Sequence, residues 1–118
     1  VATVLDGLYA AGIKPDWWKL EPQATAAAWD NIGSVIAHAD PWCRGVVLLG
    51  LSAPVATLAQ GFRDARASRS CRGFAVGRTI FEAPARAWLA GEIDDALLKT
   101  RVRATYESLI DAWREARR

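Results

Sequence analysis

The stretch Gly45–Gly50 (GVVLLG) is apolar at every position and follows the helix-breaking pair Asp40-Pro41. A strand without polar alternation is typical of a parallel sheet that is covered on both faces. Segments with the spacing of amphipathic helices lie on either side of it, at Ala24–His38 and Pro54–Arg66. Because a helix between two strands supplies the crossover that parallel pairing needs, this stretch predicts an α/β fold.

Strands and helices alternate along the rest of the chain as well. Two further strands are expected, Asp16–Pro22 and Gly73–Val76, because both are short and bounded by proline or glycine. Further helices are expected at Val1–Ala11, at Pro84–Ala90 and from Asp94 to the end. The prediction is one partial domain over 1–118 with about three βα units. These strands form either a small open sheet or three consecutive strands of an eight-stranded (β/α)8 TIM barrel.

The composition is that of an ordinary globular domain and excludes several classes of protein. Of the 118 residues, 52% are hydrophobic and 24% are charged, with a net charge of +2, which predicts a packed core and no nucleic-acid partner. The basic runs 63–72 and 114–118 are interpreted as solvated helix ends. No apolar run reaches the roughly 20 residues that span a bilayer, so neither a membrane segment nor a signal peptide is expected.

Individual residue types indicate the setting of the chain. Cys43 and Cys71 lack disulfide or zinc spacing, and core thiols in a reducing cytoplasm are expected. The only histidine, His38, is expected to cap a helix end, so no metal site is predicted. The chain has no methionine, and Val1 is therefore expected to be an internal residue of a longer protein. On helical spacing, three of the six tryptophans are expected in the core: Trp29, Trp88 and Trp113.

Residues at the carboxyl ends of the strands are the first candidates for a functional site, because ligands bind there in parallel α/β folds. Lys19 lies in the first expected strand, on the same face as Trp17 and Glu21. A lysine that loses hydration supplies the neutral amine that attacks carbonyl groups. Glu21 is placed to pair with Lys19 or to transfer a proton during this attack. The alternative is a solvated Lys–Glu pair at a sheet edge.

The ends of the second and third strands have the features of a phosphate site. Gly77 lets backbone amides approach an anion, and Arg78 adds a guanidinium group at the start of a helix. Gly50, Leu51 and Ser52 follow the preceding strand and are predicted to form the other half of the site. The alternatives are a tight turn with a surface arginine, and a Ser52 that only caps the next helix.

Three segments, Gly12–Pro22, Val47–Leu51 and Gly73–Phe81, together resemble the aldolase-like domain of bacterial inositol catabolism. That domain often follows a 5-dehydro-2-deoxygluconokinase and has carried the label of a domain of unknown function. It is similar in turn to the class I tagatose-bisphosphate aldolases, where a Lys-Val-Glu strand motif bears the Schiff-base lysine and a last-strand Gly-Arg motif binds phosphate. The resemblance covers essentially the whole chain and implies strands six to eight of a TIM barrel with their flanking helices.

The resemblance also implies roles for the candidate residues. Lys19 matches the Schiff-base lysine and Glu21 its strand neighbour, while Gly50–Ser52, and Gly77 with Arg78, match the two phosphate loops. The implied reaction cleaves 2-deoxy-5-keto-gluconate 6-phosphate to dihydroxyacetone phosphate and malonic semialdehyde, without a metal or cofactor. The implied partners are this phosphorylated sugar acid, the remainder of the barrel, a sugar kinase domain and further copies of the chain.

The sequence departs from the family pattern in three respects. Leu20 replaces the valine of the lysine motif, and Leu49–Ala53 (LGLSA) stands where the family has Leu-Ser-Ala-Gly. The strands that commonly carry a general acid or base are not part of these 118 residues. The alternative is therefore a non-catalytic phosphosugar-binding or regulatory module attached to a sugar kinase. A Lys19 directed into bulk solvent, or far from Gly77 and Arg78, would contradict the enzymatic interpretation.

Overall fold

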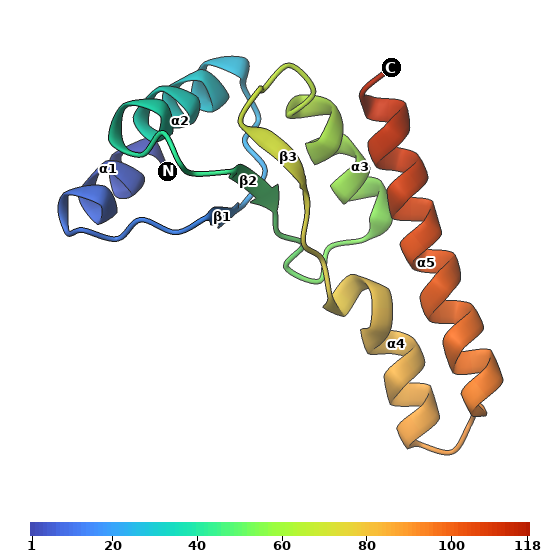
Figure 1. Ribbon diagram of the computed structural model, residues 1–118. Helices are drawn as coiled ribbons and strands as arrows, with labels where there is room; N and C mark the ends of the chain where they lie inside the picture. Colours follow the sequence, from blue (N-terminus) through green and yellow to red (C-terminus); the bar gives the residue numbers. More distant parts are fainter.

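The computed structural model describes all residues from Val1 to Arg118 and has five helices and three strands (Figure 1). Strands and helices alternate until the third strand, after which two helices follow in succession. The elements are α1 (Ala2–Ala10), β1 (Trp17–Leu20), α2 (Ala26–Ala39), β2 (Gly45–Leu48), α3 (Val55–Asp64), β3 (Cys71–Phe74), α4 (Arg78–Leu89) and α5 (Asp95–Ala116). The predicted α/β class is confirmed.

The three strands form one parallel sheet in the order β1-β2-β3. In register, Lys19 lies beside Val47, and Val47 lies beside Gly73. Between β2 and β3 the register shifts by one residue, because Val46 pairs with Cys71 but Val47 pairs with Gly73. Arg72 is therefore the extra residue of a β-bulge.

The third strand begins two residues before the predicted Gly73–Val76, and this prediction of its bounds was wrong. The strand is set by pairing with β2: the Val46 amide donates to the Ser70 carbonyl at 2.8 Å, and the Ala75 amide donates to the Leu48 carbonyl at 2.8 Å. The apolar pattern of Ala75 and Val76 instead continues into the loop after the strand. Helix α4 likewise begins at Arg78, after the N-cap Gly77, and not near Pro84, which is a buried interior residue of the helix that supplies no amide hydrogen bond.

One face of the sheet is covered by helices and forms the core. Alternate strand residues on this face, Val46, Leu48 and Cys71, are at most 1% exposed. They belong to one cluster with Trp29 of α2 and Phe62 of α3, which are also fully buried. Trp29 is thereby confirmed as a core residue, as the helical spacing predicted.

Aromatic rings join α3, β3 and α5. Phe62 stacks on Phe74 with ring centroids 5.2 Å apart, and Trp113 meets the Phe62 ring edge-on at 5.4 Å. Such pairs add about 0.5–1.5 kcal/mol each to the stabilisation that comes from burial. Leu109 is the only fully buried residue of α5, and the helix packs against both α3 and α4 along its length.

The tip of the α4–α5 hairpin extends away from the sheet (Figure 1). Trp88, predicted to be a core residue, lies here and is 43% exposed, so that prediction was wrong. Its indole N–H donates to the Asp95 carboxylate at 2.8 Å and links the ends of the two helices. Helical spacing placed Trp88 on an apolar stripe, but the exposure of this residue depends on how far α5 covers α4.

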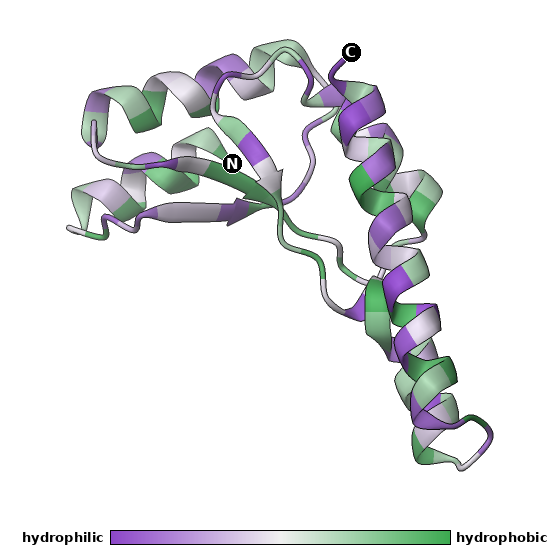
Figure 2. Ribbon diagram, turned by 45° about the vertical axis from the view of Figure 1, so that its right-hand side comes forward, coloured by the Kyte–Doolittle hydropathy of each residue, from purple (hydrophilic) through white to green (hydrophobic).

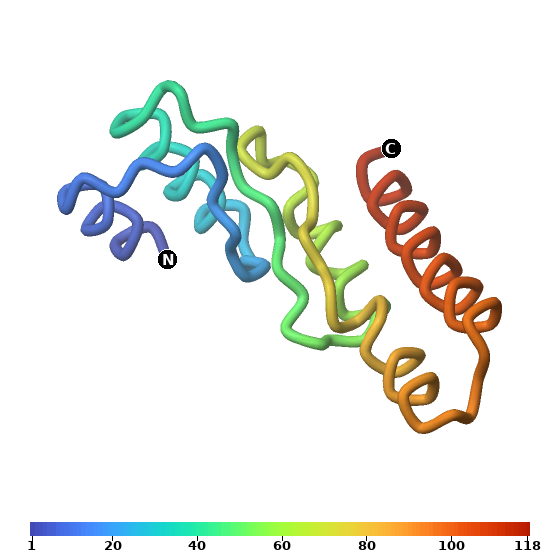
Figure 3. The backbone as a smooth tube through the Cα atoms, turned by 60° about the horizontal axis from the view of Figure 1, so that its bottom comes forward, coloured from blue at the N-terminus to red at the C-terminus, as the bar shows by residue number.

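The opposite face of the sheet has no covering layer. Its β1 residues Trp17 and Lys19 are exposed, as is Arg72 of β3. The molecule measures 50 × 32 × 20 Å with a radius of gyration of 16.5 Å. A compact domain of this length would have about 13.5 Å. Figure 3 shows the strands side by side with helices to either side of them, and apolar segments of the strands are visible in Figure 2.

Side-chain hydrogen bonds fix α1 against the sheet and cap α2 and α5. The Trp18 indole N–H donates to the Tyr9 hydroxyl at 2.7 Å, which fixes α1 beside β1. Thr25 and Asp94 cap α2 and α5, each side chain accepting an amide hydrogen bond from the first turn. None of the helices has the length and apolar character needed to cross a membrane.

Candidate functional site

A pocket of about 360 Å³ opens at the carboxyl end of the sheet. Lys19 from β1 lines it together with Gly50–Ser52 after β2 and with Gly77 and Arg78 after β3. Three elements that are separated in the sequence by some 30 residues each thus meet, because parallel strands place their carboxyl ends at the same edge. Every residue proposed from the sequence for this site lines the pocket, except Glu21.

Lys19 reaches the pocket from the uncovered face of the sheet. Residues alternate along β1, so Leu20 points to the core side and Lys19 to the opposite side. The residue is exposed, so the expectation of a water-poor setting is wrong for these 118 residues. The physical reason is that a desolvated lysine needs a second layer over the open face, whereas the described helices cover only the other one. Of the two conditions that would contradict the enzymatic interpretation, the exposure of Lys19 is met, whereas its separation from Gly77 and Arg78 is not, because all three line one pocket.

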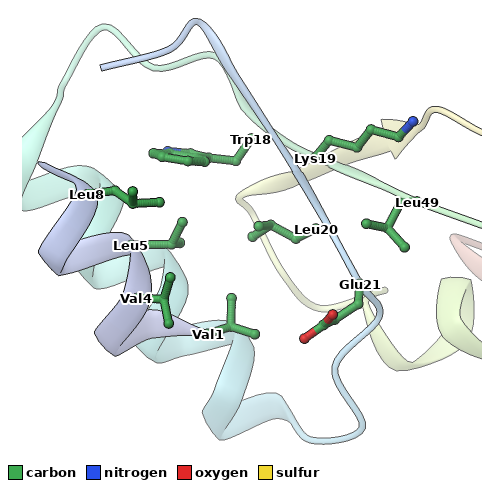
Figure 4. A pocket seen from close by; sticks show the side chains of 9 residues that line it. All are labelled: Val1, Val4, Leu5, Leu8, Trp18, Lys19, Leu20, Glu21 and Leu49. Atoms are coloured by element: carbon green, nitrogen blue, oxygen red, sulfur yellow. The ribbon is translucent and has the colours of Figure 1, made fainter. Parts of the chain in front are cut away.

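Glu21 does not pair with Lys19. Figure 4 shows the Lys19 amine pointing away from Glu21, whose carboxylate points toward Val1 at the start of α1. The only two ion pairs of the structure lie elsewhere, within α4 and α5. Glu21 follows the end of β1 and borders an apolar hollow of about 400 Å³ between α1 and β1. The predicted proton-transfer role therefore has no contact to support it.

The loop after β2 has an unusual backbone. Leu51 and Ser52 both adopt left-handed conformations, with φ angles of 45° and 61°. The Ala53 amide donates to the Gly50 carbonyl at 2.8 Å and closes a tight turn around them. Non-glycine residues with positive φ cost free energy and are concentrated at ligand sites. Ser52 does not cap the next helix, since the N-cap of α3 is Pro54, so the capping alternative is wrong.

The loop after β3 presents the start of a helix to the pocket. Gly77 is the N-cap of α4, and its carbonyl accepts the amides of Ile80 and Phe81. The Arg78 and Thr79 amides precede the first intrahelical bonds and are available to an anion, with the partial positive charge of the helix terminus behind them. Phe81 packs against Gly77: a Cβ at Gly77 would lie 3.1 Å from the Phe81 ring.

Two contacts between the loops fix their relative position, and the sequence did not reveal either. The Thr79 hydroxyl donates to the Ala53 carbonyl at 2.8 Å across 26 residues of sequence. A Cβ at Gly50 would lie 2.8 Å from a Val76 methyl group, so glycine is needed for the close approach of the loops. Thr79 follows Gly77 and Arg78 directly, and this adjacency was the only available signal for its role.

A carboxylate shares the electrostatics of this site. The pKa of Glu82 is lowered, first by a hydrogen bond from Arg86 and then by the charges of Arg86 and Arg78 and by the Ser52 hydroxyl. The Arg86 guanidinium is 2.9 Å from the Glu82 carboxylate. An anion bound between Ser52 and Arg78 must therefore tolerate or displace the Glu82 carboxylate. Sequence inspection gave no reason to include Glu82 in the site.

These residues offer one primary amine, a guanidinium group and free backbone amides around one pocket. The amine is a nucleophile for carbonyl carbon, and the amides and guanidinium are donors for phosphate oxygens. No group of three histidine, cysteine or acidic residues in the structure is arranged to hold a metal ion.

Comparisons with known proteins identify a family for nearly the whole chain. A family model described as an uncharacterised protein conserved in bacteria (DUF2090) matches residues 1–117. No match was found among curated proteins or among solved structures.

Proposed function

The chain belongs to this bacterial family, and we propose that it forms the catalytic part of a class I sugar-phosphate aldolase. In this proposal β1, β2 and β3 are strands six to eight of a (β/α)8 barrel, and the open face of the sheet is the inside of that barrel. The proposal is supported by the parallel pairing of the three strands and by the helix that follows each of them in the sequence, as in a (β/α)8 barrel.

The observation that carries the proposal is the meeting of Lys19 with both loops in one pocket. The two loops follow consecutive strands at the carboxyl edge, which is where phosphate sites of barrel enzymes are commonly built. Arg78 and the first amides of α4 would hold the phosphate, and the Lys19 amine would lie beside the carbonyl of the same substrate. Holding the two reacting groups together in this way supplies much of the rate enhancement of such enzymes.

The proposed substrate is 2-deoxy-5-keto-gluconate 6-phosphate. The Lys19 amine adds to the C5 ketone and water leaves, which gives an iminium ion. A base removes the proton of the C3 hydroxyl, the C3–C4 bond breaks, and its electron pair moves into the iminium to form an enamine. Malonic semialdehyde leaves, the enamine is protonated at C4, and hydrolysis releases dihydroxyacetone phosphate and the free lysine. Glu21 is not in contact with Lys19, so the base comes from elsewhere in the proposed barrel.

A covering layer is a necessary part of this proposal. Lys19 is exposed on the open face, and exclusion of water requires further strands over that face. The remainder of a barrel supplies such a layer, with a sugar kinase domain and further copies of the chain as the other proposed partners. On its own the described domain should associate through its open face and lack activity. A monodisperse monomer in size-exclusion chromatography with light scattering would count against this.

Borohydride trapping tests the proposal directly. The intact protein is mixed with dihydroxyacetone phosphate and sodium borohydride, which reduces a Schiff base to a stable secondary amine. The domain has three lysines, Lys14, Lys19 and Lys99, so peptide mass spectrometry assigns the adduct without ambiguity. The adduct is expected on Lys19, to persist in Lys14→Ala and Lys99→Ala proteins, and to be lost in Lys19→Ala. An adduct that survives the Lys19→Ala change would rule out the assignment.

A second candidate function is a phosphosugar-binding module without catalysis. The exposure of Lys19 and its lack of contact with Glu21 favour this reading, because neither feature suits an activated nucleophile. In that case Lys19 and Arg78 act only as cations toward phosphate. Calorimetry with dihydroxyacetone phosphate would then show binding that weakens in both Lys19→Ala and Arg78→Gln proteins, while borohydride traps no adduct in the wild-type protein.

A further inference from the structure

A second hollow lies at the opposite, amino-terminal end of the sheet. It has a volume of about 350 Å³ and is lined by three arginines, Arg44, Arg69 and Arg72, and by Asp40. Arg44 precedes β2, Arg69 lies in the loop before β3, and Arg72 is in β3. The sequence indicated solvated helix ends for the run 63–72. Arg69 and Arg72 are exposed as expected, but α3 ends at Asp64, so they border this hollow and do not lie at a helix end.

The β-bulge brings Arg72 to the hollow. As the extra residue between the Val46–Cys71 and Val47–Gly73 pairs, Arg72 is free of the regular alternation of β3. Its side chain passes over Gly45, where a Cβ would lie only 2.9 Å from the Arg72 Cγ. Gly45 also has a φ angle of 126°, which side-chain-bearing residues rarely adopt. A Cβ at Gly45 would lie closer still, 2.5 Å, to the Ser70 carbonyl oxygen, so the glycine is needed first for the approach of the β3 backbone, and the Arg72 side chain crosses the same space.

A second glycine makes room for Ser70 on the other wall. A Cβ at Gly33 of α2 would lie 2.8 Å from the Ser70 hydroxyl, so the helix approaches the loop closely. The Arg69 and Ser70 amides donate to no carbonyl or side chain of the protein. The segment Arg69–Ser70, which lines the hollow, therefore has two backbone amides without a hydrogen-bond partner in the protein.

The charge of this hollow is not balanced within the protein. Neither of the two ion pairs in the structure includes Arg44, Arg69 or Arg72. Asp40 is the only carboxylate that lines the hollow, and it is 7% exposed and accepts the Trp42 amide at 3.0 Å. Three exposed arginines border the hollow with at most one carboxylate, and such an unbalanced positive charge attracts anions.

We propose that this hollow is a binding site for a compact phosphorylated small molecule, separate from the pocket of Lys19. Planar guanidinium groups form paired hydrogen bonds with phosphate oxygens, and free backbone amides are the other usual donors. The volume fits one or two phosphate groups with a small organic body and is at the lower end of small-molecule sites. The shared chemistry is the phosphate group, whether from an inorganic polyphosphate or from a phosphate ester.

Calorimetric titration at low ionic strength tests the site on the intact protein, with inorganic pyrophosphate and glycerol 3-phosphate as probes. The double variant Arg69→Gln, Arg72→Gln is expected to bind about tenfold or more weakly than wild type, because each lost guanidinium removes a charge-assisted hydrogen bond. Added sodium chloride should weaken wild-type binding. Tighter pyrophosphate binding would identify a free polyanion as the ligand type, and tighter glycerol 3-phosphate binding a phosphate ester.

Two controls separate this site from general charge and from the Lys19 pocket. The double variant Arg101→Gln, Arg114→Gln removes two exposed, unpaired arginines of α5 and should bind as wild type does. Both titrations are repeated in an Arg78→Gln background, so that phosphate binding at the Lys19 pocket does not contribute to the difference between wild-type and variant hollows. The proposal is overturned if the protein with an intact hollow binds neither probe in this background, if the Arg69, Arg72 variant keeps its affinity within about twofold, or if the Arg101, Arg114 control loses as much.

Discussion

The two faces of the same small sheet differ in almost every physical respect. On the covered face Val46 and Leu48 are fully buried, and Phe74 stacks on Phe62 of α3. On the open face Trp17 and Lys19 are exposed. The covered face carries the stability of the domain, whereas the open face and its two ends carry the groups capable of chemistry. A single sheet can separate these tasks because successive side chains of a strand point in opposite directions.

The largest difference in stability should appear between truncation of a core phenylalanine and truncation of one beside the Lys19 pocket. Phe62→Ala removes a fully buried ring at the centre of the aromatic cluster and should cost about 3–5 kcal/mol of unfolding free energy. Phe81→Ala removes a ring that is 48% exposed beside the Lys19 pocket and should cost about 1 kcal/mol or less. Urea denaturation followed by circular dichroism measures both. Equal losses would show that the open end is packed as firmly as the core.

A smaller effect is expected from the hydrogen bond that joins the two loops. Thr79→Val removes the donor to the Ala53 carbonyl and should cost about 1 kcal/mol, because a half-buried carbonyl loses its partner. Thr100→Val is a matched control, since the Thr100 hydroxyl donates to Ala96 within an exposed turn of α5. That change should alter stability by less than about 0.5 kcal/mol. If the two valine variants behave alike in urea, the loops are not held by Thr79.

The left-handed turn gives a smaller effect still. Leu51 has a φ of 45° and is 70% exposed, so glycine would relieve backbone strain at little loss of burial. Leu51→Gly should be more stable than Leu51→Ala by about 0.5–1 kcal/mol, as positive φ is penalised only in the alanine variant. Thermal unfolding of the two proteins compares them directly. An alanine variant that is the more stable of the two would contradict this backbone conformation.

The smallest effect concerns the pH dependence of stability and compares the buried Cys71 with the half-buried Cys43. Burial raises the pKa of the Cys71 thiol, although the Arg117 charge acts in the opposite direction. The unfolded chain therefore ionises first, so the contribution of this thiol is fully present below about pH 8.5 and is lost as the pH rises toward the folded pKa. Wild type and Cys43→Ala should lose stability over this alkaline range, and Cys71→Ala should lose less. Parallel curves for all three proteins would exclude Cys71 as the cause.

Much of the fold could be predicted because it depends on local patterns. The apolar run Gly45–Gly50 identified β2, and helical spacing located the helices to within a few residues, except for the start of α4. The third strand was displaced by two residues because its bounds depend on pairing with β2 and on a bulge, and neither leaves a mark in the apolar pattern. The exposure of Trp88 could not be predicted either, because it depends on how much of α4 is packed against α5.

Prediction of the candidate site succeeded for position and failed for environment. Strand order placed Lys19, Gly50–Ser52 and Gly77 with Arg78 at one end of the sheet, and they line one pocket. Spacing also suggested a desolvated Lys19 paired with Glu21, and the structure shows neither. Desolvation depends on layers from other parts of a fold. The pairing of Glu21 with Lys19 depends on the path of the chain after β1, which ends at Leu20. The alternation of side chains along a strand does not predict where a residue beyond its end points.

By itself, the sequence determined the parallel α/β order and which residues end each strand, because apolar periodicity, prolines and glycines act over a few neighbouring residues. Only the tertiary structure decided that Thr79 ties one loop to the other and that Arg44, Arg69 and Arg72 border one hollow. These contacts depend on strand register, on the bulge at Arg72 and on the room left at Gly45. Such features arise from packing between distant segments, where a shift of one residue redirects a side chain to another face.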